Sequence, residues 1–232
     1  MDISVLIITC DHYNHLWEGT GLSWTLLSGL EDLGLHVVSD NKLFDYKHKS
    51  FIPLSLNKPN YTKNDFSNKV IYALDQIPTK YVLFIDEDMW PERSIKRLMP
   101  KFIDFMEETN ADALQIHEKL SWWDYSFDST DIFIDGERVL KMKQDSSYLL
   151  SHNAVIWNKE YFKSIQIPDE DAWENEIRGS IRAQKTPHNI YHYNIRWYIQ
   201  WIKQYIESNT HEAFINDLRY KKEFNKKFNI KN

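Results

Sequence analysis

The chain has 232 residues, enough for one large domain or for one domain with a small appendage. Hydrophobic residues make up 42% of it and aromatic residues 15%, so the apolar side chains can build a sizeable core. The formal net charge of −6 gives no electrostatic basis for general nucleic-acid binding, and no nucleic-acid partner is expected.

Cysteine usage and the first residues bear on the compartment. The single cysteine, Cys10, excludes an internal disulfide and fits a reducing environment. Near the start, only Val5 to Ile8 are continuously apolar, which is too short for a signal peptide or a membrane span. These features predict a cytoplasmic protein.

The last residues, RYKKEFNKKFNIKN from Arg219 onward, carry many basic side chains against the single acid Glu223. We favour a solvated helical end, in which the lysines extend into water. The alternative is contact with an anionic lipid surface, which would make the protein peripheral at the inner membrane.

The first elements predict the start of a doubly wound α/β sheet. Residues 3–9 form a short run rich in β-branched side chains, typical of a strand buried on both faces. Residues 16–33 carry leucines at helical spacing and end before Gly34, which suits a helix stop. Residues 35–38 form a second short strand, so the order is strand, helix, strand.

The middle of the chain continues to alternate between helices and strands. After an irregular stretch over 41–62, the pattern predicts a helix over 65–76, a strand over 81–85, a helix over 91–109 and a strand over 113–117. Together with the first three elements, these form a predicted nucleotide-binding half, residues 1–120.

Residues 121–195 form a predicted acceptor half. Within DIFIDGERVL, Asp135-Gly136 predicts a hairpin turn. Residues 146–157 are extended, and residues 168–185 predict a helix whose acidic start suits the helix dipole. The remaining residues, 196–232, are expected to form a helical, basic extension.

Three consecutive acids, Asp86-Glu87-Asp88, follow the apolar strand. In an open α/β sheet, ligands lie beyond the carboxyl ends of the strands, and Asp86 and Asp88 point to the same side there. Two such carboxylates repel each other unless a cation joins them, and hard oxygen ligands suit magnesium or manganese together with substrate phosphates. The alternative is a solvated acidic loop in which Asp88 caps the next helix. The position after a buried strand favours the metal site.

A second acidic cluster lies in PDEDAWENEIRGS. Transfer of a group from an activated sugar to a hydroxyl needs a base, and a carboxylate at a helix start can serve. Asp171 and Glu174 are three residues apart and share a helix face, whereas Glu176 points elsewhere. The alternative is that these acids complement the helix dipole and pair with Arg178 and Arg182.

Four motifs occur in a fixed order: ISVLIITCDHYNHLW, YVLFIDEDMW, YLLSHNAVIWNKEYF and DAWENEIRGS. In this order they resemble the metal-dependent GT-A glycosyltransferases, and more narrowly the short transferases of capsule, lipopolysaccharide and related surface-glycan synthesis. The resemblance implies one GT-A catalytic domain over residues 1–195, a Rossmann-like, doubly wound mixed sheet with helices on both faces.

The resemblance implies roles for single residues on the donor side. Thr9 and Asp11 would line the nucleotide pocket, with Asp40 as a further contact. Asp86 and Asp88 would hold a divalent cation, manganese or magnesium, and through it the donor diphosphate. Because another acid lies between them, which carboxylates touch the metal stays open.

On the acceptor side, the resemblance implies Glu174 as the catalytic base. Asp171 is its rival, because other families of this fold use a Glu-Asp pair there. Trp157 and Trp173 would shape the acceptor side. His192 would be a further metal ligand, since some members of the fold supply a late histidine.

The predicted function is transfer of a sugar, a hexose in the first place, from a nucleoside-diphosphate donor such as a UDP-sugar to a glycan or lipid-linked hydroxyl, with inversion. One alternative is a non-catalytic carbohydrate-binding homologue. Another is a sugar nucleotidyltransferase, which usually needs a glycine- and lysine-rich phosphate loop that CDHYNHLWEGT lacks. The side chains of Trp122, Trp123 and Tyr125 would stack on sugars or, as we favour slightly, pack in the protein.

Overall fold

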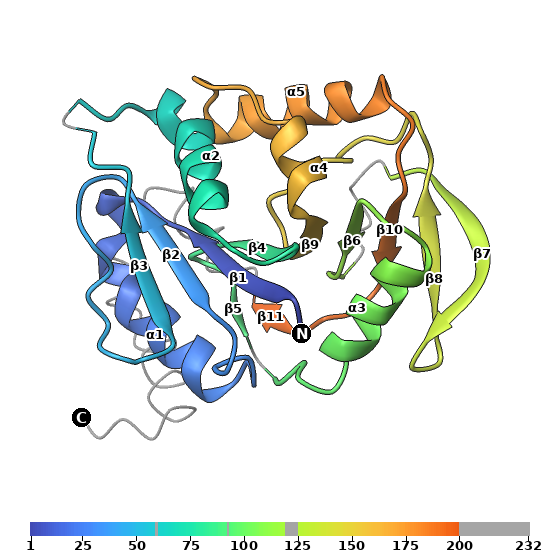
Figure 1. Cartoon of the computed structure of the whole chain (residues 1–232), viewed down its shortest axis with the longest axis horizontal. Coiled ribbons are helices and arrows are strands. Elements are labelled where there is room, and N and C mark those ends of the chain that lie inside the picture. The colour runs from blue at the N-terminus through green and yellow to red at the C-terminus, as the bar shows by residue number, and fades with distance from the viewer. Residues whose placement is uncertain (59, 92, 119–124, 200–232) are drawn as a thin grey trace.

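The computed structural model describes residues 1–58, 60–91, 93–118 and 125–199. Its main feature is a nine-stranded mixed sheet in the order β3-β2-β1-β4-β9-β6-β10-β8-β7, with helices on both faces (Figure 1). A small two-stranded sheet joins β5 (Trp90–Pro91) to β11 (Tyr198–Ile199). The predicted α/β class with a mixed sheet is confirmed.

Four parallel strands form one half of the sheet: β1 (Ile3–Ile8), β2 (Leu35–Ser39), β3 (Phe51–Ser55) and β4 (Tyr81–Asp86). β1 lies between β2 and β4. Its side chains alternate between the two faces, so that Val5 and Ile7 enter one core cluster while Leu6 and Ile8 enter the other. Burial on both faces explains why this strand is apolar at every position except Ser4.

Five further strands complete the sheet: β6 (Ala113–Gln115), β7 (Phe127–Ile134), β8 (Glu137–Met142), β9 (Val155–Asn158) and β10 (Ile190–Tyr193). β9 is antiparallel to both of its neighbours, β4 and β6. β10 runs parallel to β6 and antiparallel to β8. The two predicted halves of the chain are therefore joined in a single continuous sheet.

The helices cover the two faces of this sheet. α1 (Trp17–Leu26) and α3 (Met99–Glu108) pack on one face, and α2 (Phe66–Gln76), α4 (Lys159–Ser164) and α5 (Ala172–Gln184) pack on the other (Figure 1). Two short 3-10 helices, η1 (Asp11–Leu16) and η2 (Lys63–Asp65), precede α1 and α2. Within the described residues, none of the helices combines the length and apolar composition needed to cross a bilayer.

Several predicted elements have other bounds in the structure. The extended stretch expected over 146–157 is a strand only from Val155, and the helix expected over 168–185 begins at Ala172. The helix expected over 16–33 ends at Leu26, because the chain turns through Gly29 at a φ of +70°. The helix expected over 91–109 begins at Met99, since Trp90–Pro91 pairs with β11. The stretch expected to be irregular contains β3, whose proline is tolerated because β3 is an edge strand.

The hairpin is confirmed at the predicted turn. β7 and β8 are joined by Asp135 and Gly136, whose φ angles of 53° and 87° suit the primed turns that match strand twist. Tyr125 is buried against the rings of Phe127 and Tyr148, so it packs in the protein instead of facing a sugar. Trp122, Trp123 and nearly all of the expected helical extension lie outside the described residues, and Tyr198–Ile199 form a strand.

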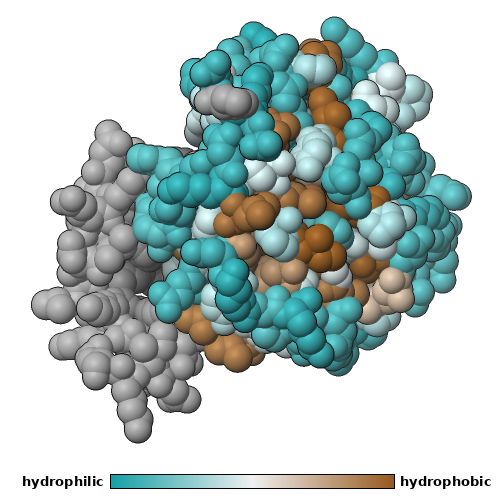
Figure 2. All heavy atoms as spheres, turned by 60° about the vertical axis from the view of Figure 1, so that its left-hand side comes forward, coloured by the Kyte–Doolittle hydropathy of each residue, from teal (hydrophilic) through white to brown (hydrophobic). Residues whose placement is uncertain are grey.

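The face shown in Figure 2 is hydrophilic over most of its rim, with apolar residues gathered toward the middle. In the N-terminal half of the chain, the large apolar side chains that remain exposed include Leu26, Leu43 and Ile52. Single exposed apolar side chains are common on soluble proteins and indicate no binding site by themselves.

Candidate functional site

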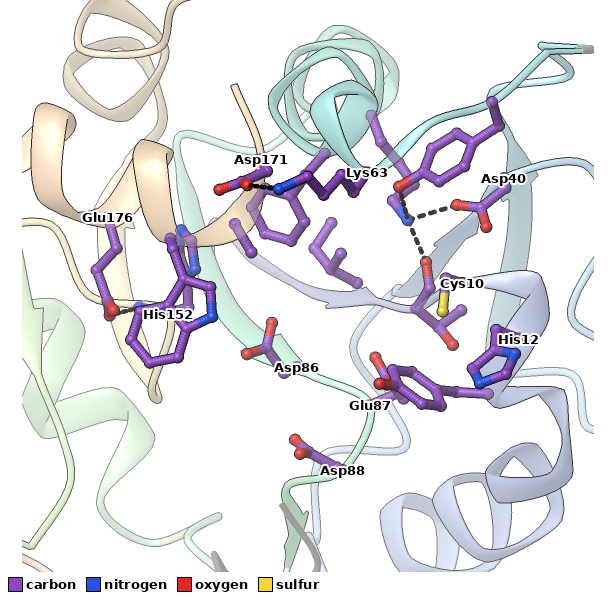
Figure 3. A pocket seen from close by; sticks show the side chains of 18 residues that line it. Cys10, His12, Asp40, Lys63, Asp86, Glu87, Asp88, His152, Asp171 and Glu176 are labelled. Carbon is purple, nitrogen blue, oxygen red and sulfur yellow. Dashed lines mark hydrogen bonds and ion pairs between the residues drawn. The ribbon is translucent and has the colours of Figure 1, made fainter. Parts of the chain in front are cut away.

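The carboxyl ends of β1 and β4 lie next to each other, with Ile8 paired to Asp86. β1 continues to β2 on its other side, so the sheet has its topological switch point here. Open α/β sheets bind ligands in the crevice outside such a point. A cavity of about 530 Å³ lies at this position, between the two strand ends and the start of α5 (Figure 3).

The acidic triplet forms the floor of this cavity. Asp86, Glu87 and Asp88 all line it, and Glu87 and Asp88 are only 7% and 6% exposed. The Glu87 amide donates to the Ile8 carbonyl at 3.0 Å, which extends the pairing with β1 past the end of β4. The Glu87 carbonyl accepts from Thr20 Oγ1 at 2.9 Å and from Trp90 Nε1 at 3.0 Å. α1 and the residues after β4 thus fix the backbone that carries the acids.

The three carboxyl groups affect one another electrostatically. Burial, followed by the charges of Asp88 and Asp86, raises the pKa of Glu87 well above its ordinary value. Burial and the nearby Glu87 charge likewise raise the pKa of Cys10 to about 12, so this side chain stays a thiol. The floor of the cavity is therefore a place where added positive charge is favourable.

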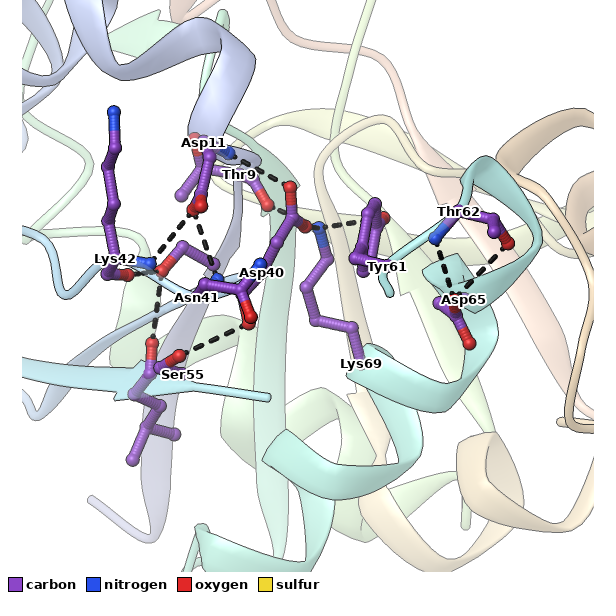
Figure 4. A network of polar contacts seen from close by, with 12 residues as sticks. Thr9, Asp11, Asp40, Asn41, Lys42, Ser55, Tyr61, Thr62, Asp65 and Lys69 are labelled. Carbon is purple, nitrogen blue, oxygen red and sulfur yellow. Dashed lines mark hydrogen bonds and ion pairs between the residues drawn. The ribbon is translucent and has the colours of Figure 1, made fainter. Parts of the chain in front are cut away.

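A buried lysine organises a second wall (Figure 4). Lys69, on α2, is 1% exposed and its Nζ lies 2.7 Å from Asp40 Oδ1. The same ammonium donates to the Thr9 carbonyl and, at 3.3 Å, to the Tyr61 hydroxyl. Burial raises the pKa of Tyr61, so its hydroxyl keeps the proton and can donate it in a hydrogen bond. This network ties the end of β1 to the end of β2.

The third wall is the N-terminal end of α5. Asp171 is the N-cap of this helix: its Oδ1 accepts from the Glu174 amide at 2.8 Å, and a Glu174 carboxylate oxygen accepts from the Asp171 amide at 3.3 Å. Lys63 Nζ lies 2.9 Å from Asp171 Oδ2. Trp173 and Glu176 line the cavity beside Asp171. Acids from two segments, the end of β4 and the start of α5, thus line the same cavity.

Comparison with solved structures shows which fold this sheet and its helices form. S. aureus TarS 1–349, a glycosyltransferase of the GT-A type, matches with a TM-score of 0.54 at 16% identity, over 85% of this chain and 59% of that one. The chain has a GT-A fold. The same TarS fragment in complex with UDP-GlcNAc matches at TM-score 0.54 and 18% identity, over 85% and 57% of the two chains. Its complex with UDP matches at TM-score 0.55 and 18% identity, over 85% and 59%.

At this level of sequence identity, the likeness to TarS shows the fold alone. The chain spans less than two thirds of the TarS fragment that it matches. No protein-family model matches the sequence, and no curated protein does so either.

Within the GT-A fold, the predicted donor residues separate into two groups. Thr9, Asp40, Asp86 and Asp88 all line the cavity. Asp11 is not among the lining residues, because its Oδ1 accepts from the amides of residues 41 and 42 at 3.1 and 3.0 Å (Figure 4). In this structure, Asp11 holds the loop after β2 in place.

The two predicted candidates for the catalytic base, Glu174 and its rival Asp171, lie in different places relative to the cavity. Glu174 does not line the cavity: it closes the capping box and pairs with Arg178 at 2.9 Å. Asp171 and Glu176 do line it (Figure 3). The preference for Glu174 came from the resemblance, and helix spacing placed Glu176 on another face than Asp171 and Glu174. However, the cap residue precedes the helix, and the lining face of α5 follows Trp173 and Glu176, three residues apart.

Two other expected residues lie away from the cavity, while one lies at its edge. Trp157 is fully buried in the core and its ring stacks on Phe162 at 4.7 Å, so it does not shape an acceptor site. His192 lies on β10, three strands from β4 in the sheet order, roughly 14 Å away at ordinary strand spacing. Its ring instead packs 5.0 Å from that of His117. Trp173 lines the cavity and is 60% exposed, as an acceptor-side residue would be.

The sequence analysis did not predict several lining residues as site residues: Tyr61, Lys63, Lys69, His152 and Glu176, the last of which it had placed on another helix face. Lys69 sits in an ordinary amphipathic helix, and nothing local distinguishes it from a surface lysine. Glu176 carried a usable signal, its spacing from Trp173. His152 donates its amide to Glu176 Oε1 at 3.0 Å, a contact between distant segments that no local pattern reveals.

Proposed function

We propose that this protein is a glycosyltransferase that moves a sugar from a UDP-sugar to a hydroxyl of a glycan or lipid-linked acceptor. One observation carries the proposal: the Asp86 to Asp88 acids and the acids of α5 line opposite sides of one cavity at the switch point of a GT-A fold. The solved TarS structures of this fold contain UDP-GlcNAc and UDP, which supports a uridine nucleotide as the donor carrier.

The nucleoside would lie against the wall formed by Asp40, Tyr61 and Lys69. The Asp40 carboxylate can accept a hydrogen bond and the Tyr61 hydroxyl can donate one. The three N–H groups of Lys69 already bind Asp40, the Thr9 carbonyl and Tyr61, so this buried lysine holds the wall in place. Uracil presents one N–H donor between two carbonyl acceptors, which such a mixed wall can match. Tyr61 also offers a ring face for stacking.

The donor set on the floor fits a divalent cation. Asp86 and Asp88 supply hard carboxylate oxygens, the ligands that magnesium and manganese prefer. Within the described residues, no three His, Cys, Asp or Glu side chains converge as a metal-binding group. Magnesium commonly uses one or two carboxylates and takes its other ligands from substrate phosphates and water, so a two-carboxylate site suits it. When bound, the cation would neutralise charge on the departing diphosphate.

The base would come from the opposite wall, and we assign it to Asp171. As the acceptor oxygen bonds to the anomeric carbon, its proton passes to the Asp171 carboxylate, and the bond from that carbon to the diphosphate oxygen breaks. Attack from the side opposite the leaving group inverts the configuration. Glu176, which accepts the His152 amide, would orient the acceptor next to Trp173.

A thermal-shift panel of nucleotide sugars, with and without manganese, tests this proposal. A donor that binds the native state raises the melting temperature according to its affinity. We expect a UDP-sugar to give the largest shift, and to do so with manganese. Product analysis with that donor and glycan or lipid-linked acceptors then separates a transferase from a protein that binds sugars without turnover.

A further inference from the structure

An ion pair in the lining of the cavity joins two segments far apart in the sequence. Lys63, on η2, reaches from the segment before α2 to Asp171 at the start of α5, with Nζ 2.9 Å from Oδ2 (Figure 3). Both residues line the same cavity as Asp86 and Asp88. The pair therefore places a cation beside the proposed base, in the cavity where a donor diphosphate would bind.

The two partners differ in how firmly they are held. Asp171 is 14% exposed and fixed by the helix cap, and the preceding residue, Glu170, exchanges hydrogen bonds with Ser67 at 2.9 and 3.1 Å. The Lys63 side chain is 81% exposed on a flexible aliphatic stem. If the pair opens, Lys63 is the partner that moves.

The charges around the cavity leave Lys63 as the lysine that can pair with an entering anion. Acids dominate the lining, and the two lining lysines are Lys63 and Lys69. Lys69 is buried in its pair with Asp40. A diphosphate entering this cavity would attract the exposed ammonium of Lys63 more strongly than a single carboxylate does, because it carries more charge and more acceptor oxygens.

We propose that Lys63 moves from Asp171 to the diphosphate when the donor binds, and so releases the base only in the donor complex. The inference rests on the proposed function and adds a residue and an order of events to it. Before donor binding, the ammonium holds the Asp171 carboxylate. Afterwards that carboxylate can take the acceptor proton, while Lys63 faces the negative charge of the leaving diphosphate.

The electrostatics of the site agree with this order. The Glu174 amide first, and then Lys63, lower the pKa of Asp171, which makes it a weaker base. Removing Lys63 raises that pKa. Other charged or titratable side chains near Asp171 are Asp169, Glu174 with its partner Arg178, and the cavity residues Glu176, His152 and Asp86.

A double-mutant cycle on UDP binding tests the proposal, measured by titration calorimetry in magnesium. Lys63→Met should weaken UDP binding about tenfold, the scale of one charged hydrogen bond. Lys163→Met removes the same charge from a surface pair with Asp75 and should leave the affinity unchanged. Asp171→Asn keeps a good helix cap. It should tighten UDP binding about threefold, because it frees Lys63 from an exposed pair.

The decisive comparison is Asp171→Asn in the Lys63→Met background. If Lys63 switches partners, the tightening disappears there. Equal tightening in both backgrounds means a general charge effect and overturns the proposal. If UDP fails to bind wild-type protein at all, the proposed function itself fails, so the two failures are distinguishable.

Carboxylate NMR provides a second, independent readout. With labelled aspartate, adding UDP and magnesium should raise the pKa of Asp171 in the wild type. In Lys63→Met the pKa should already be raised and should not respond to UDP. An Asp171 pKa that stays low in the wild-type UDP complex would overturn the proposal even if UDP binds tightly.

Discussion

The Nζ of Lys69 lies 2.7 Å from Oδ1 of Asp40, and the two side chains are 1% and 7% exposed. Taking one partner from a buried pair leaves the other charge without compensation. We expect Lys69→Met to lower the free energy of unfolding by about 3–5 kcal/mol in urea titrations. Lys69→Met with Asp40→Asn should be more stable than Lys69→Met alone, because the uncompensated charge is gone.

Lys163→Met is the matched control for this prediction, since its pair with Asp75 is about half exposed on both sides. It should cost less than about 1 kcal/mol. If Lys69→Met proved as mild as this control, the buried network that links β1 to β2 would not be stabilising in the way we infer.

Gly19 lets a helix approach the acidic loop closely. A Cβ on this residue would lie 2.2 Å from the Trp90 ring, whose Nε1 donates to the Glu87 carbonyl. Gly19→Ala should therefore displace Trp90, cost about 1–3 kcal/mol of stability, and weaken manganese-dependent binding of UDP. Glu18→Ala, an exposed change on the same helix, serves as the control. Wild-type binding and stability in Gly19→Ala would contradict the close packing.

The acids of α5 should differ sharply in their effect on transfer. Asp171→Asn should lower kcat about 10²- to 10⁴-fold, the range for loss of a general base. Glu174→Gln should stay within a few-fold of wild type, because its side chain lies outside the cavity. Steady-state kinetics with the donor found in the thermal-shift panel would measure both. The reverse ranking would restore Glu174 as the base.

Asp65 predicts a pH dependence of stability. Burial opposes its ionisation, but Lys58, the Thr62 amide and Asn68 together lower the pKa of Asp65 from 3.8 to about 2. Figure 4 shows the contact between Asp65 and Thr62. Because the folded-state pKa is depressed, its contribution is complete above the unfolded pKa and is lost as the pH falls through the folded one. The stability difference between wild type and Asp65→Asn should thus be constant above about pH 5, shrink as the pH falls toward 2 and vanish below it. A difference that keeps its full size down to pH 2 would show that charge is not its origin.

The parts of the fold that the sequence predicts are those with local signals. β1, β2 and β4 are short and mostly apolar because both of their faces are buried. The β7–β8 hairpin has a turn that needs positive φ angles, which Asp135-Gly136 supplies. The acids at the end of β4 stand out because charge follows directly on a buried strand.

The parts that it does not predict depend on distant contacts. β9 inserts between β4 and β6, an arrangement that sequence order does not suggest. β10 is a short buried strand after the last helix, and its pairing with β6 and β8 decides that His192 lies far from the acids. Which carboxylate of α5 faces the cavity depends on where the helix begins, and local patterns fix that start only to within a few residues.

Binding of UDP to wild-type protein and to the Asp86→Asn, Asp88→Asn variant, each with manganese and with a chelator, tests the central claim most directly. The account predicts that wild-type protein binds UDP in manganese and that the chelator lowers this affinity at least tenfold, the scale of losing a charged contact. The variant should bind UDP equally weakly with manganese and with the chelator. Equal UDP affinity for wild type and variant in manganese would contradict it.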